Sequence, residues 1–537
     1  MSEKTGIFAN TAGNFAGKIK SKRRKTVRDL FREGTIVKPY ERLSQEHIQR
    51  LHNASLSILN DLGIWCYNER AAGLFGDHGA RVWEEIEHGQ TVWRVSLPAG
   101  LVEEAVKKAP SRFFLGARNP KNRLLLDSQI PRIYFGTGSE TNTWIETAME
   151  QFVSTGLHDV AIQAPCFTEL RGNTKLLGRA AQLCENLENL DFFIRPVNIQ
   201  DPDVTEDNHD VNKFFASLNN ITKHVQAGLT RLDRLDDVVR MAEIIAGGKK
   251  ALRENPIISF IACVFKSPLQ FVRDTADKVF AIVKAGLPLV ISSSPQGGSS
   301  APIQEAGMVA QINAEILAGI TFTQLIREGA PVLYGSVPVR ARMDDLHDFY
   351  GCPEFNQYNI DCAQMARFYK VPCYSTAGVG DAKVPGMQAL FEKLFTHLYV
   401  AMSGAQYIHY AFGLLDRTNS FCPVQAVLDD EQIGKIKHCL RMPKVSQTDV
   451  DDAVKMIAKV MGSSHRLFAR HARKAIHAGD VSKPYRFEAR GMSDRVIEYA
   501  VTRLAEIESR PAPHLSADVL DKVYAEIPGL LPRLRRE

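Results

Sequence analysis

The chain has 537 residues, of which 45% are hydrophobic and 24% charged. This composition is ordinary for a globular protein and excludes a collagen-like chain or one that is disordered throughout. The length exceeds the size at which a single hydrophobic core stops growing, so we expect one large domain with additions or two to three domains.

Charge and hydropathy narrow the class of protein further. A formal net charge of +5 is too small to indicate nucleic-acid binding by itself. No segment has the run of about 20 apolar residues that a membrane helix requires. No apolar run follows the charges of residues 1–14 either. We therefore expect a soluble, cytoplasmic protein that binds neither nucleic acid nor a membrane.

The nine cysteines are scattered and include no Cys-x-x-Cys pair. This spacing favours reduced, mostly buried side chains over a disulfide framework. Cys352, Cys362 and Cys373 come nearest to a thiolate metal site, but their spacings of ten and eleven residues match no common zinc pattern. We expect no bound metal in this chain.

Residues 1–42 are predicted to form a basic, flexible N-terminal arm. They contain eleven Lys and Arg against four Asp and Glu, a balance of +7. The basic residues are interspersed with Gly, Asn and Ser, a composition typical of a mobile segment. A solvated tail or a strap over a neighbouring subunit is the favoured interpretation, and contact with nucleic acid or a membrane is the alternative.

Residues 43–130 are predicted to form an α-rich N-terminal layer. Ser44 is a good N-cap, a helical stripe of apolar residues begins with Ile48, and Gly63 ends that helix. The further elements predicted for this layer are a helix over 69–78, a short strand and a helix over 97–108.

From residue 131 to 428 short apolar runs alternate with helical segments. Eight strands are predicted, over 132–137, 192–198, 224–229, 257–263, 287–292, 331–335, 372–375 and 406–410. Helices are predicted between most of them, over 168–187, 210–219, 232–247, 271–285, 304–327, 353–369 and 387–403. Each strand is apolar along its length rather than alternating, which predicts a parallel sheet covered on both faces.

Eight strands with helices between them indicate an α/β fold, and we predict a (β/α)8 TIM barrel as the catalytic domain. An open doubly wound sheet is the alternative, although no Gly-x-Gly-x-x-Gly follows the first strand. Residues 429–537 are predicted to form a helical C-terminal region, with helices over 449–460, 494–508 and 516–526.

In such barrels the active site lies at the carboxyl ends of the strands. The residues that follow the predicted strands are rich in Gly, Ser and Thr and poor in carboxylate pairs. Aromatic side chains gather at the same ends, which suits a cation held by ring faces; packing of the barrel is the alternative for any single ring. The aromatic candidates for substrate binding are Tyr134, Phe135, Phe265, Tyr334, Tyr374, Tyr410 and Phe412.

Charged candidates follow two of the later strands. Arg340 and Arg342 come after the sixth strand, where one of them is placed to bind a substrate carboxylate. The alternative for each is an ion pair with a nearby carboxylate such as Asp344 or Asp345.

The glycine-rich segment 375–383 follows the seventh strand, at a position where barrels often bind phosphate. Asp381 and Lys383 are the candidate catalytic residues of this segment, with the alternative that they pair with each other.

Several segments resemble the trimethylamine methyltransferase superfamily, and the resemblance extends from about residue 42 to 530. The segments are RLSQEHIQRLHNASLSILNDLGI (42–64), LPAGLVEEAVKKAP (97–110), SSPQGGSSAPIQEAGMVAQINAEILAGITFTQLIREGAPVLYGS (293–336), GCPEFNQYNIDCAQMARFYKVP (351–372), GVGDAKVPGMQALFE (378–392) and SGAQYIHYAFGLL (403–415).

The resemblance implies a fold, a reaction and a cofactor. Founding members of the superfamily use pyrrolysine to handle a tertiary amine, and this chain lacks that residue, so it is similar to the larger non-pyrrolysine branch. Characterised enzymes there demethylate quaternary amines such as glycine betaine and pass the methyl group to a corrinoid protein. The resemblance therefore implies a (β/α)8 barrel and a methyltransferase that acts on a quaternary amine, glycine betaine or a related betaine. It also implies a corrinoid (cobalamin) supplied by a partner protein. The position equivalent to pyrrolysine falls within 376–383.

The physics of the reaction agrees with the loss of pyrrolysine. A quaternary nitrogen leaves as a neutral amine, so no acid has to protonate it, and the enzyme contributes positioning and electrostatics. Two alternatives remain: a Schiff-base or phosphate-binding barrel lyase that uses Lys266 or Lys383, and a non-catalytic quaternary-amine binding protein. A large barrel with added layers is also expected to form a homo-oligomer.

Overall fold

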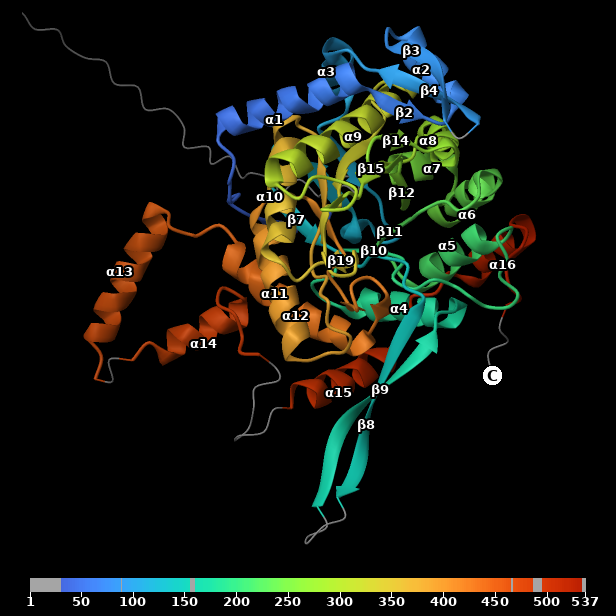
Figure 1. Cartoon of the computed structure of the whole chain (residues 1–537). Helices are drawn as coiled ribbons and strands as arrows, with labels where there is room; N and C mark the ends of the chain where they lie inside the picture. Colours follow the sequence, from blue (N-terminus) through green and yellow to red (C-terminus); the bar gives the residue numbers. More distant parts are fainter. Residues whose placement is uncertain (1–29, 88, 155–159, 465–466, 486–494, 534–537) are drawn as a thin grey trace, which may run out of the picture. The chain divides into compact units, whose positions relative to one another are not determined.

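The computed structural model describes residues 30–87, 89–154, 160–464, 467–485 and 495–533 (Figure 1). By its contacts the chain divides after Leu30, and the residues from Phe31 onward form one compact unit. Most of the predicted basic arm lies outside the described residues. The domain boundaries predicted at 42/43, 130/131 and 428/429 all lie inside the large unit. They stay predictions.

The fold is mixed α/β around a curled sheet that is mostly parallel. Of its eight parallel strands, the seven from β10 to β21 neighbour one another in chain order, and β7, the first in the chain, lies beside β21, the last. The order has no reversal of the kind that a doubly wound sheet has. The eight strands are β7 (Arg132–Phe135), β10 (Phe192–Ile194), β11 (His224–Ala227), β12 (Ile258–Cys263), β15 (Leu289–Ser293), β17 (Val332–Ser336), β20 (Cys373–Thr376) and β21 (Tyr407–His409). All eight predicted strands are therefore present. A ninth strand, β1 (Thr35–Ile36), pairs antiparallel with β7.

Helices follow most of these strands, as predicted. They are α4 (Thr174–Asn186), α5 (His209–Asn220), α6 (Leu235–Ala246) with the short α7 (Lys249–Glu254), α8 (Arg273–Ala285), α9 (Glu305–Ile326), α10 (Pro353–Phe368), α11 (Met387–Met402) and α12 (Pro423–Leu440). No separate helix was predicted at α12, although most of it lies in the region 429–537 that was predicted to be helical. The predicted helix over 168–187 begins only at Thr174, because the residues before it complete a strand.

The helix α9 lies in the centre of the fold. It contacts β15 and β17 on one side and the N-terminal helices α1 (Gln45–Ser57) and α3 (Ala99–Lys108) on the other. It is the one helix of the described residues that is long and apolar enough to cross a membrane, and 89% of its apolar window is buried inside the fold. That burial explains an apolar helix without a lipid environment.

The N-terminal layer combines helices with a small sheet. Ser44 caps α1 by accepting a hydrogen bond from the His47 amide at 3.2 Å, and Gly63 ends the helix at a φ of 69° after a π-helical turn, as predicted. The remaining elements are α2 (Glu69–Asp77) and the sheet β13 (Phe265–Lys266), β14 (Gln270–Phe271), β2 (Ile64–Cys66), β4 (Gln90–Ser96) and β3 (Arg81–Glu87). Because β13 and β14 follow β12 in the chain, the segment after a central strand supplies two of the five strands of this separate sheet.

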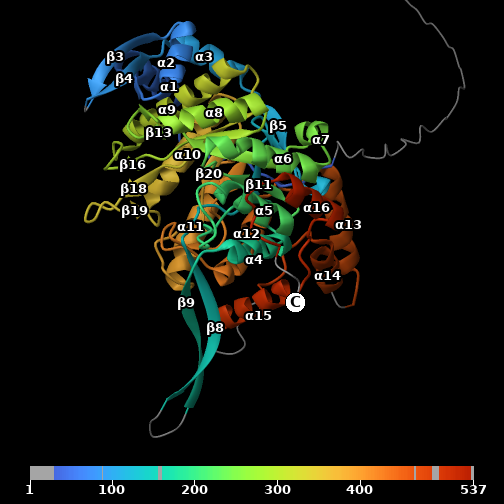
Figure 2. The same cartoon turned by 90° about the vertical axis from the view of Figure 1, so that its right-hand side faces the viewer.

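A long hairpin is inserted between β7 and α4, and the sequence did not indicate it. Its strands β8 (Thr143–Ser154) and β9 (Val160–Arg171) pair antiparallel along their whole length. In Figures 1 and 2 the hairpin extends away from the rest of the fold. Shorter strands near it and near the carboxyl ends of the central sheet are β22 (Leu414–Leu415), β23 (Ser420–Phe421), β16 (Gln296–Gly297), β18 (Val339–Ala341) and β19 (Asp348–Phe349).

The amino-terminal end of the sheet is filled by a second hairpin, and the chain ends in helices. Leu115 of β5 (Arg112–Leu115) and Leu124 and Leu126 of β6 (Leu124–Asp127) join Tyr134 and Tyr407 in one buried cluster. The C-terminal helices are α13 (Gln447–Met461), α14 (Ala469–Ala478), α15 (Val496–Glu508) and α16 (Ala517–Glu526). The predicted helical character of this region is thus confirmed for the described residues.

Candidate functional site

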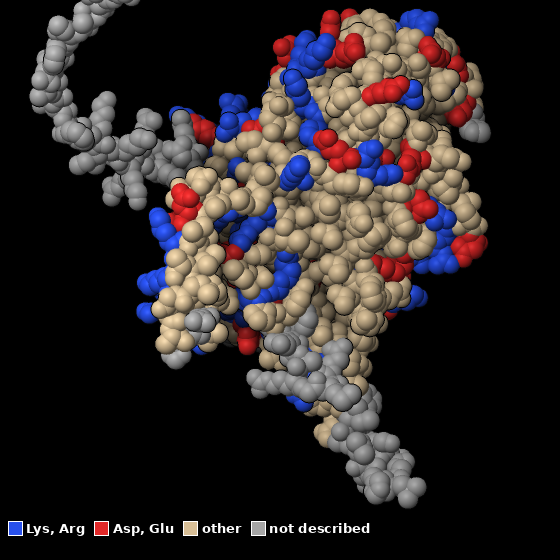
Figure 3. Space-filling view, turned by 90° about the vertical axis from the view of Figure 1, so that its left-hand side faces the viewer, with Lys and Arg blue, Asp and Glu red and all other residues tan. Residues whose placement is uncertain are grey.

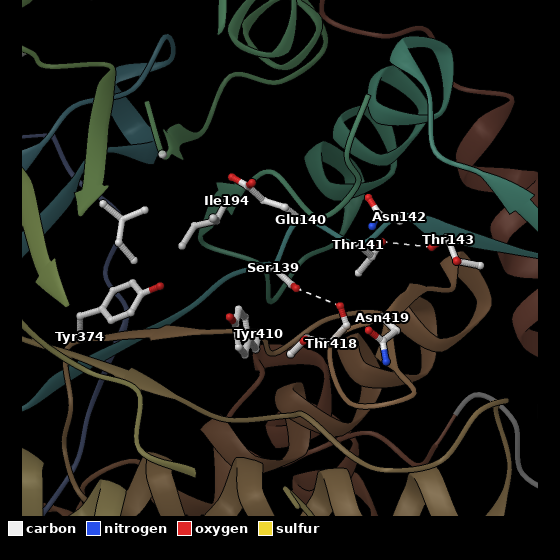
Figure 4. Close-up of a pocket in the computed structure, with 12 residues that line it drawn as sticks. Ser139, Glu140, Thr141, Asn142, Thr143, Ile194, Tyr374, Tyr410, Thr418 and Asn419 are labelled. Atoms are coloured by element: carbon white, nitrogen blue, oxygen red, sulfur yellow. Dashed lines mark hydrogen bonds between the residues drawn. The ribbon is translucent and has the colours of Figure 1, made fainter. Parts of the chain in front are cut away.

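A pocket of about 640 Å³ lies at the carboxyl ends of the parallel strands (Figure 4). Its walls come from the loop after β7, the ends of β10, β11 and β12, the strand β20 and the loops after β21. The lining residues are Ser139, Glu140, Thr141, Asn142, Thr143, Ile194, Gly228, Ile261, Tyr374, Tyr410, Thr418 and Asn419. This is the end of the sheet at which the sequence places the site.

Two tyrosines form the aromatic wall of the pocket. Tyr374 stacks on His409 with 4.1 Å between ring centroids, and Tyr410 lies 3.8 Å from the same imidazole ring. Tyr410 has a φ of 68°, a backbone conformation that bulky residues rarely adopt. A Cβ on Gly138 would come within 2.4 Å of the Tyr410 ring. Glycine at that position is therefore what allows the ring its place.

His409 supports the tyrosines as an uncharged ring. Its Nε2 atom lies 2.7 Å from Thr376 Oγ1. Burial holds the pKa of His409 well below its usual range, so the imidazole is neutral at physiological pH. The imidazole that packs against Tyr374 and Tyr410 therefore carries no positive charge.

Glu140 brings a carboxylate to the pocket. Its side chain is 48% exposed, and it forms an ion pair with Arg195, whose side chain is only 2% exposed. Burial opposes the charge on Glu140, but the charges of Arg195 and Lys213 outweigh burial and lower the pKa of the carboxyl. Glu140 is thus ionised at neutral pH, with its partner behind it and the pocket in front.

A second ion pair lies behind the first. Lys213 and Asp210, both on α5 and both fully buried, are 2.5 Å apart. Asp210 also accepts hydrogen bonds from the backbone amides of Thr230 and Arg231, at 2.9 and 2.8 Å. Burial and the nearby Arg195 lower the pKa of Lys213 to about 8. The two acids and two bases balance in formal charge, and of the four only Glu140 lines the pocket.

Only two of the seven aromatic candidates line the pocket. Tyr374 and Tyr410 do so, while Tyr134 lies deeper in the sheet interior and donates a hydrogen bond to the Arg32 carbonyl at 2.9 Å. Successive side chains of a strand point to opposite faces, so Phe135, next to Tyr134, packs edge-on against His397 among the helices.

The other three aromatic candidates are core residues. Tyr334 points outward and donates a hydrogen bond to Asn313 Oδ1 at 2.9 Å. Phe265 packs against Phe271 with 5.2 Å between ring centroids, and Phe412 is buried in the main apolar cluster. Packing, the alternative weighed for single rings, describes the position of each.

Neither arginine candidate lines the pocket. Arg340 pairs with Glu354 at 3.3 Å and lies over the ring of Phe349. Arg342 pairs with Asp344 and lies 3.6 Å from Asp345, as the alternative interpretation had it. The proposed carboxylate fork is thus not at the place where the tyrosines meet.

The two catalytic candidates also lie outside the pocket lining. The Asp381 carboxylate accepts a hydrogen bond from the Gly351 amide at 3.0 Å, and burial raises its pKa. Lys383 is exposed, as is Lys266, the other lysine considered for an imine. Within the described residues no three His, Cys, Asp or Glu side chains gather as a metal site.

The sequence places Glu140 directly after the first predicted strand, at the end where the site is expected, but it assigns this residue no role. A single carboxylate at a strand end is a common surface feature, and its partners lie 55 and 73 positions further along the chain. Asp210 and Lys213 have the spacing of an ordinary surface pair on a helix. No local signal distinguishes them from exposed residues.

Comparisons with known proteins give a consistent result. The family model described as trimethylamine methyltransferase (MTTB) matches residues 15–148 and 168–478. The gap between the two matched segments falls within the β8–β9 hairpin.

Individual relatives cover most of the chain. The trimethylamine methyltransferase MttB of Desulfitobacterium hafniense (strain DSM 10664 / DCB-2) is 29% identical over 495 residues, 90% of this chain and 93% of its own length. The glycine betaine methyltransferase of Desulfitobacterium hafniense (strain Y51) is 27% identical over 451 residues, 82% of this chain and 85% of its own. Trimethylamine methyltransferase MttB1 of Methanosarcina mazei is 28% identical over 439 residues, 80% of this chain and 82% of its own.

Proposed function

The chain belongs to the trimethylamine methyltransferase (MTTB) family, and on that premise we propose that it transfers a methyl group from a quaternary amine to the Co(I) of a corrinoid protein. The observation that carries the proposal is the pocket itself. Two tyrosines and one ionised carboxylate meet there, at the carboxyl ends of the strands. Relatives named for trimethylamine and for glycine betaine support a methylated amine as the substrate.

The pocket suits a permanently charged nitrogen. Ring faces attract a cation by about 0.5–2 kcal/mol each, most strongly where water is excluded. Tyr374 and Tyr410 supply the rings, and Ile194 and Ile261 supply an apolar wall for the methyl groups. Glu140 supplies the opposite charge. These residues bind and orient the substrate without donating a proton to it.

The chemistry requires little more of the protein. The corrinoid protein would supply Co(I) as the nucleophile. A Co–C bond would form as the C–N bond breaks, and the electron pair of the C–N bond would remain on nitrogen, which leaves as a neutral tertiary amine. No proton moves, which agrees with a wall that holds one carboxylate and no acid–base pair. The positive charge on nitrogen decreases as the C–N bond breaks, so Glu140 stabilises the bound substrate more than the transition state. Its removal is expected to raise KM more than it lowers kcat.

The proposal includes a closed barrel. An isolated parallel bridge joins Gly136, just after β7, to Phe192 of β10. The Asp191 amide donates to the Phe135 carbonyl at 2.7 Å, and the Asp191 carboxylate accepts from the Phe135 amide at 2.9 Å. A Cβ on Gly136 would come within 2.2 Å of the Phe192 ring, so glycine permits this close approach. These contacts support closure between the first and second of the eight strands.

The proposal also includes a homo-oligomer, for which two uncovered helix faces provide the support. The exposed apolar residues of α11 are Met387, Leu390, Phe391, Leu394 and Phe395, and those of α13 are Val450, Val454, Ile457 and Met461. Their spacings of three and four residues are those of faces that pack against another helix. On the side of the molecule that carries α13, Lys and Arg are scattered among uncharged residues (Figure 3).

In a homo-oligomer, a second copy of the chain would cover the apolar faces of α11 and α13. Light scattering of Ile457→Asp and Phe391→Asp should then show smaller particles than the unaltered protein. Lys455→Asp, a matched change on α13 outside the apolar face, should leave the particle size unchanged. A monomeric unaltered protein would contradict this part of the proposal.

The test of function uses the full chain with chemically reduced cobalamin as the methyl acceptor. Addition of a quaternary amine should convert the cob(I)alamin spectrum to that of methylcobalamin, and Glu140→Ala should slow this at low substrate concentration. Binding of quaternary amines without any methyl transfer, even with a corrinoid protein supplied, would make the chain a binding protein. Trapping of a carbonyl substrate by borohydride would favour the lyase alternative.

A further inference from the structure

The charges on the pocket wall define which quaternary amine fits. Among the twelve lining residues the only formal charge is that of Glu140, and the wall contains no Lys or Arg. Betaines carry a carboxylate in addition to the ammonium group. A site that selects a betaine needs a positively charged or strongly donating partner for that carboxylate. The wall offers the ammonium a counter-ion and the carboxylate none.

The two cations that lower the pKa of Glu140 are already paired. Arg195 is buried behind Glu140 and paired with it, and Lys213 is paired with Asp210. Lys213 also donates a hydrogen bond to Thr230 Oγ1 at 3.1 Å. Neither belongs to the residues that line the pocket.

The arginines that the sequence suggested for a carboxylate are also paired elsewhere. Arg340 binds Glu354, and Arg342 binds Asp344. Neither belongs to the residues that line the pocket. No cation of the described wall is therefore left to neutralise a second charge on the substrate.

Distance makes the selection stronger. The carboxylate of glycine betaine is one methylene away from its nitrogen, so both groups enter the same small pocket. A nitrogen held near Glu140 brings the substrate carboxylate close to the carboxylate of Glu140. Two like charges in a partly desolvated site repel each other more strongly than they would in water.

The rest of the wall suits a neutral polar group. Hydroxyl and amide side chains of Thr141, Asn142, Thr143, Thr418 and Asn419 lie together on the side away from Tyr374 (Figure 4). Such groups donate and accept single hydrogen bonds, which matches a substrate hydroxyl. They do not supply the net charge that would compensate a carboxylate.

We propose that this pocket selects a quaternary ammonium whose remaining substituent is uncharged, a choline-like alcohol or a simple tetraalkylammonium, and discriminates against betaines. The inference rests on the proposed function, since it names the substrate class of the same site. Glu140 is its specificity-determining residue. The carboxylate attracts the ammonium in both classes, but it repels the second charge of a betaine.

The experiment measures binding and transfer separately on the full chain. Titration calorimetry with choline, tetramethylammonium and glycine betaine should give dissociation constants at least ten-fold lower for the first two. The order of kcat/KM for methylation of cob(I)alamin should be the same. Glycine betaine binding as tightly as choline would overturn the inference and leave the proposed function standing. Failure of all three to bind would overturn both.

Variants of Glu140 test the cause of the selection. Glu140→Gln keeps the shape of the side chain and removes its charge, so the repulsion of a substrate carboxylate disappears. The preference for choline over glycine betaine should then fall at least ten-fold or reverse. Glu140→Asp keeps the charge and should keep the preference, and Glu104→Gln, an exposed residue of α3, is the matched control. A preference unchanged in Glu140→Gln, with normal thermal stability, would contradict the role of this carboxylate.

Discussion

Glu140 and Arg195 form an ion pair across the wall of the pocket, and the two members have different surroundings. The arginine side chain is 2% exposed, whereas almost half of the glutamate side chain reaches open space. The guanidinium is fixed by burial, so it holds the carboxylate in one orientation toward the bound ligand. This arrangement gives the pocket a negative charge at a fixed position.

The buried pair behind it should be essential for stability. Lys213→Met leaves Asp210 as an uncompensated buried charge, which costs about 3–5 kcal/mol of unfolding free energy. Lys278→Met provides a matched control, because Lys278 also lies 2.5 Å from an aspartate on its own helix, and that aspartate, Asp274, is 68% exposed. The control should lose less than about 1 kcal/mol. Urea denaturation measures the unfolding free energy of both variants. Equal losses in the two would contradict a special contribution of the buried Lys213–Asp210 pair to stability.

The ring of Tyr374 should matter more for affinity than its hydroxyl. Tyr374→Phe keeps the π face, so the dissociation constant for tetramethylammonium should stay within about three-fold of the unaltered value. Tyr374→Leu removes the face and should weaken binding about ten-fold. Calorimetry gives these constants.

Tyr334 is the control for that experiment. Tyr334→Phe deprives the buried Asn313 of a hydrogen bond, so it should lower stability by about 1–3 kcal/mol without changing the affinity. A larger loss of affinity in this variant than in Tyr374→Leu would mean that the cation binds elsewhere.

Gly138 should control the position of Tyr410. In Gly138→Ala the new Cβ meets the Tyr410 ring at 2.4 Å, so the ring must move out of the wall. We expect the KM for the quaternary amine to rise about ten-fold or more, because cation–π attraction falls steeply with displacement. Gly100→Ala adds a methyl group to open space on helix α3, and it should leave KM unchanged and raise stability by about 0.5–1 kcal/mol.

Asp361 should make stability depend on pH. Burial raises its pKa to about 7, while the nearby Arg42 acts in the opposite direction. Because the folded chain binds this proton more tightly than the unfolded chain, the contribution favours folding below about pH 4 and is lost as pH rises toward 7. Asp361→Asn should abolish this loss, which is at most about 4 kcal/mol. Urea denaturation of both proteins at pH 5 and pH 8 tests the prediction, and parallel pH profiles would contradict it.

The sequence predicted the strands well because their signal is local. Buried parallel strands such as β12 and β15 are continuous apolar runs, and the helices between them have their own periodicity. The β8–β9 hairpin was not predicted because its strands pair with each other, and the side chains at 148–151 and 163–171 are exposed or half-buried, so no buried face there imposes a pattern. The helix α12 was not predicted as a separate element, although most of it falls in the predicted helical region, because it is buried on several sides and its apolar residues form no single stripe.

The site was predictable in location but only partly in composition. Whether Tyr134 or Phe135 faces the sheet interior depends on the pleat, and a strand of four residues with consecutive rings leaves that open. Tyr410 was identified because it ends a strand. Glu140 also follows a strand, but its role could not be predicted, because what distinguishes it is the buried charge of Arg195, which comes from another strand end far along the chain.

The position of helix α9 in the sequence also constrains how the chain can fold during synthesis. The inner surfaces of α1 and α3 pack on it, although about 200 residues of sequence lie between α3 and the start of α9. During synthesis the first of these helices therefore emerges from the ribosome long before the segment that shields it. Until residues 305–326 have been translated, the nascent N-terminal layer exposes the apolar surface that α9 later covers, and exposed apolar surface of this kind promotes aggregation during folding.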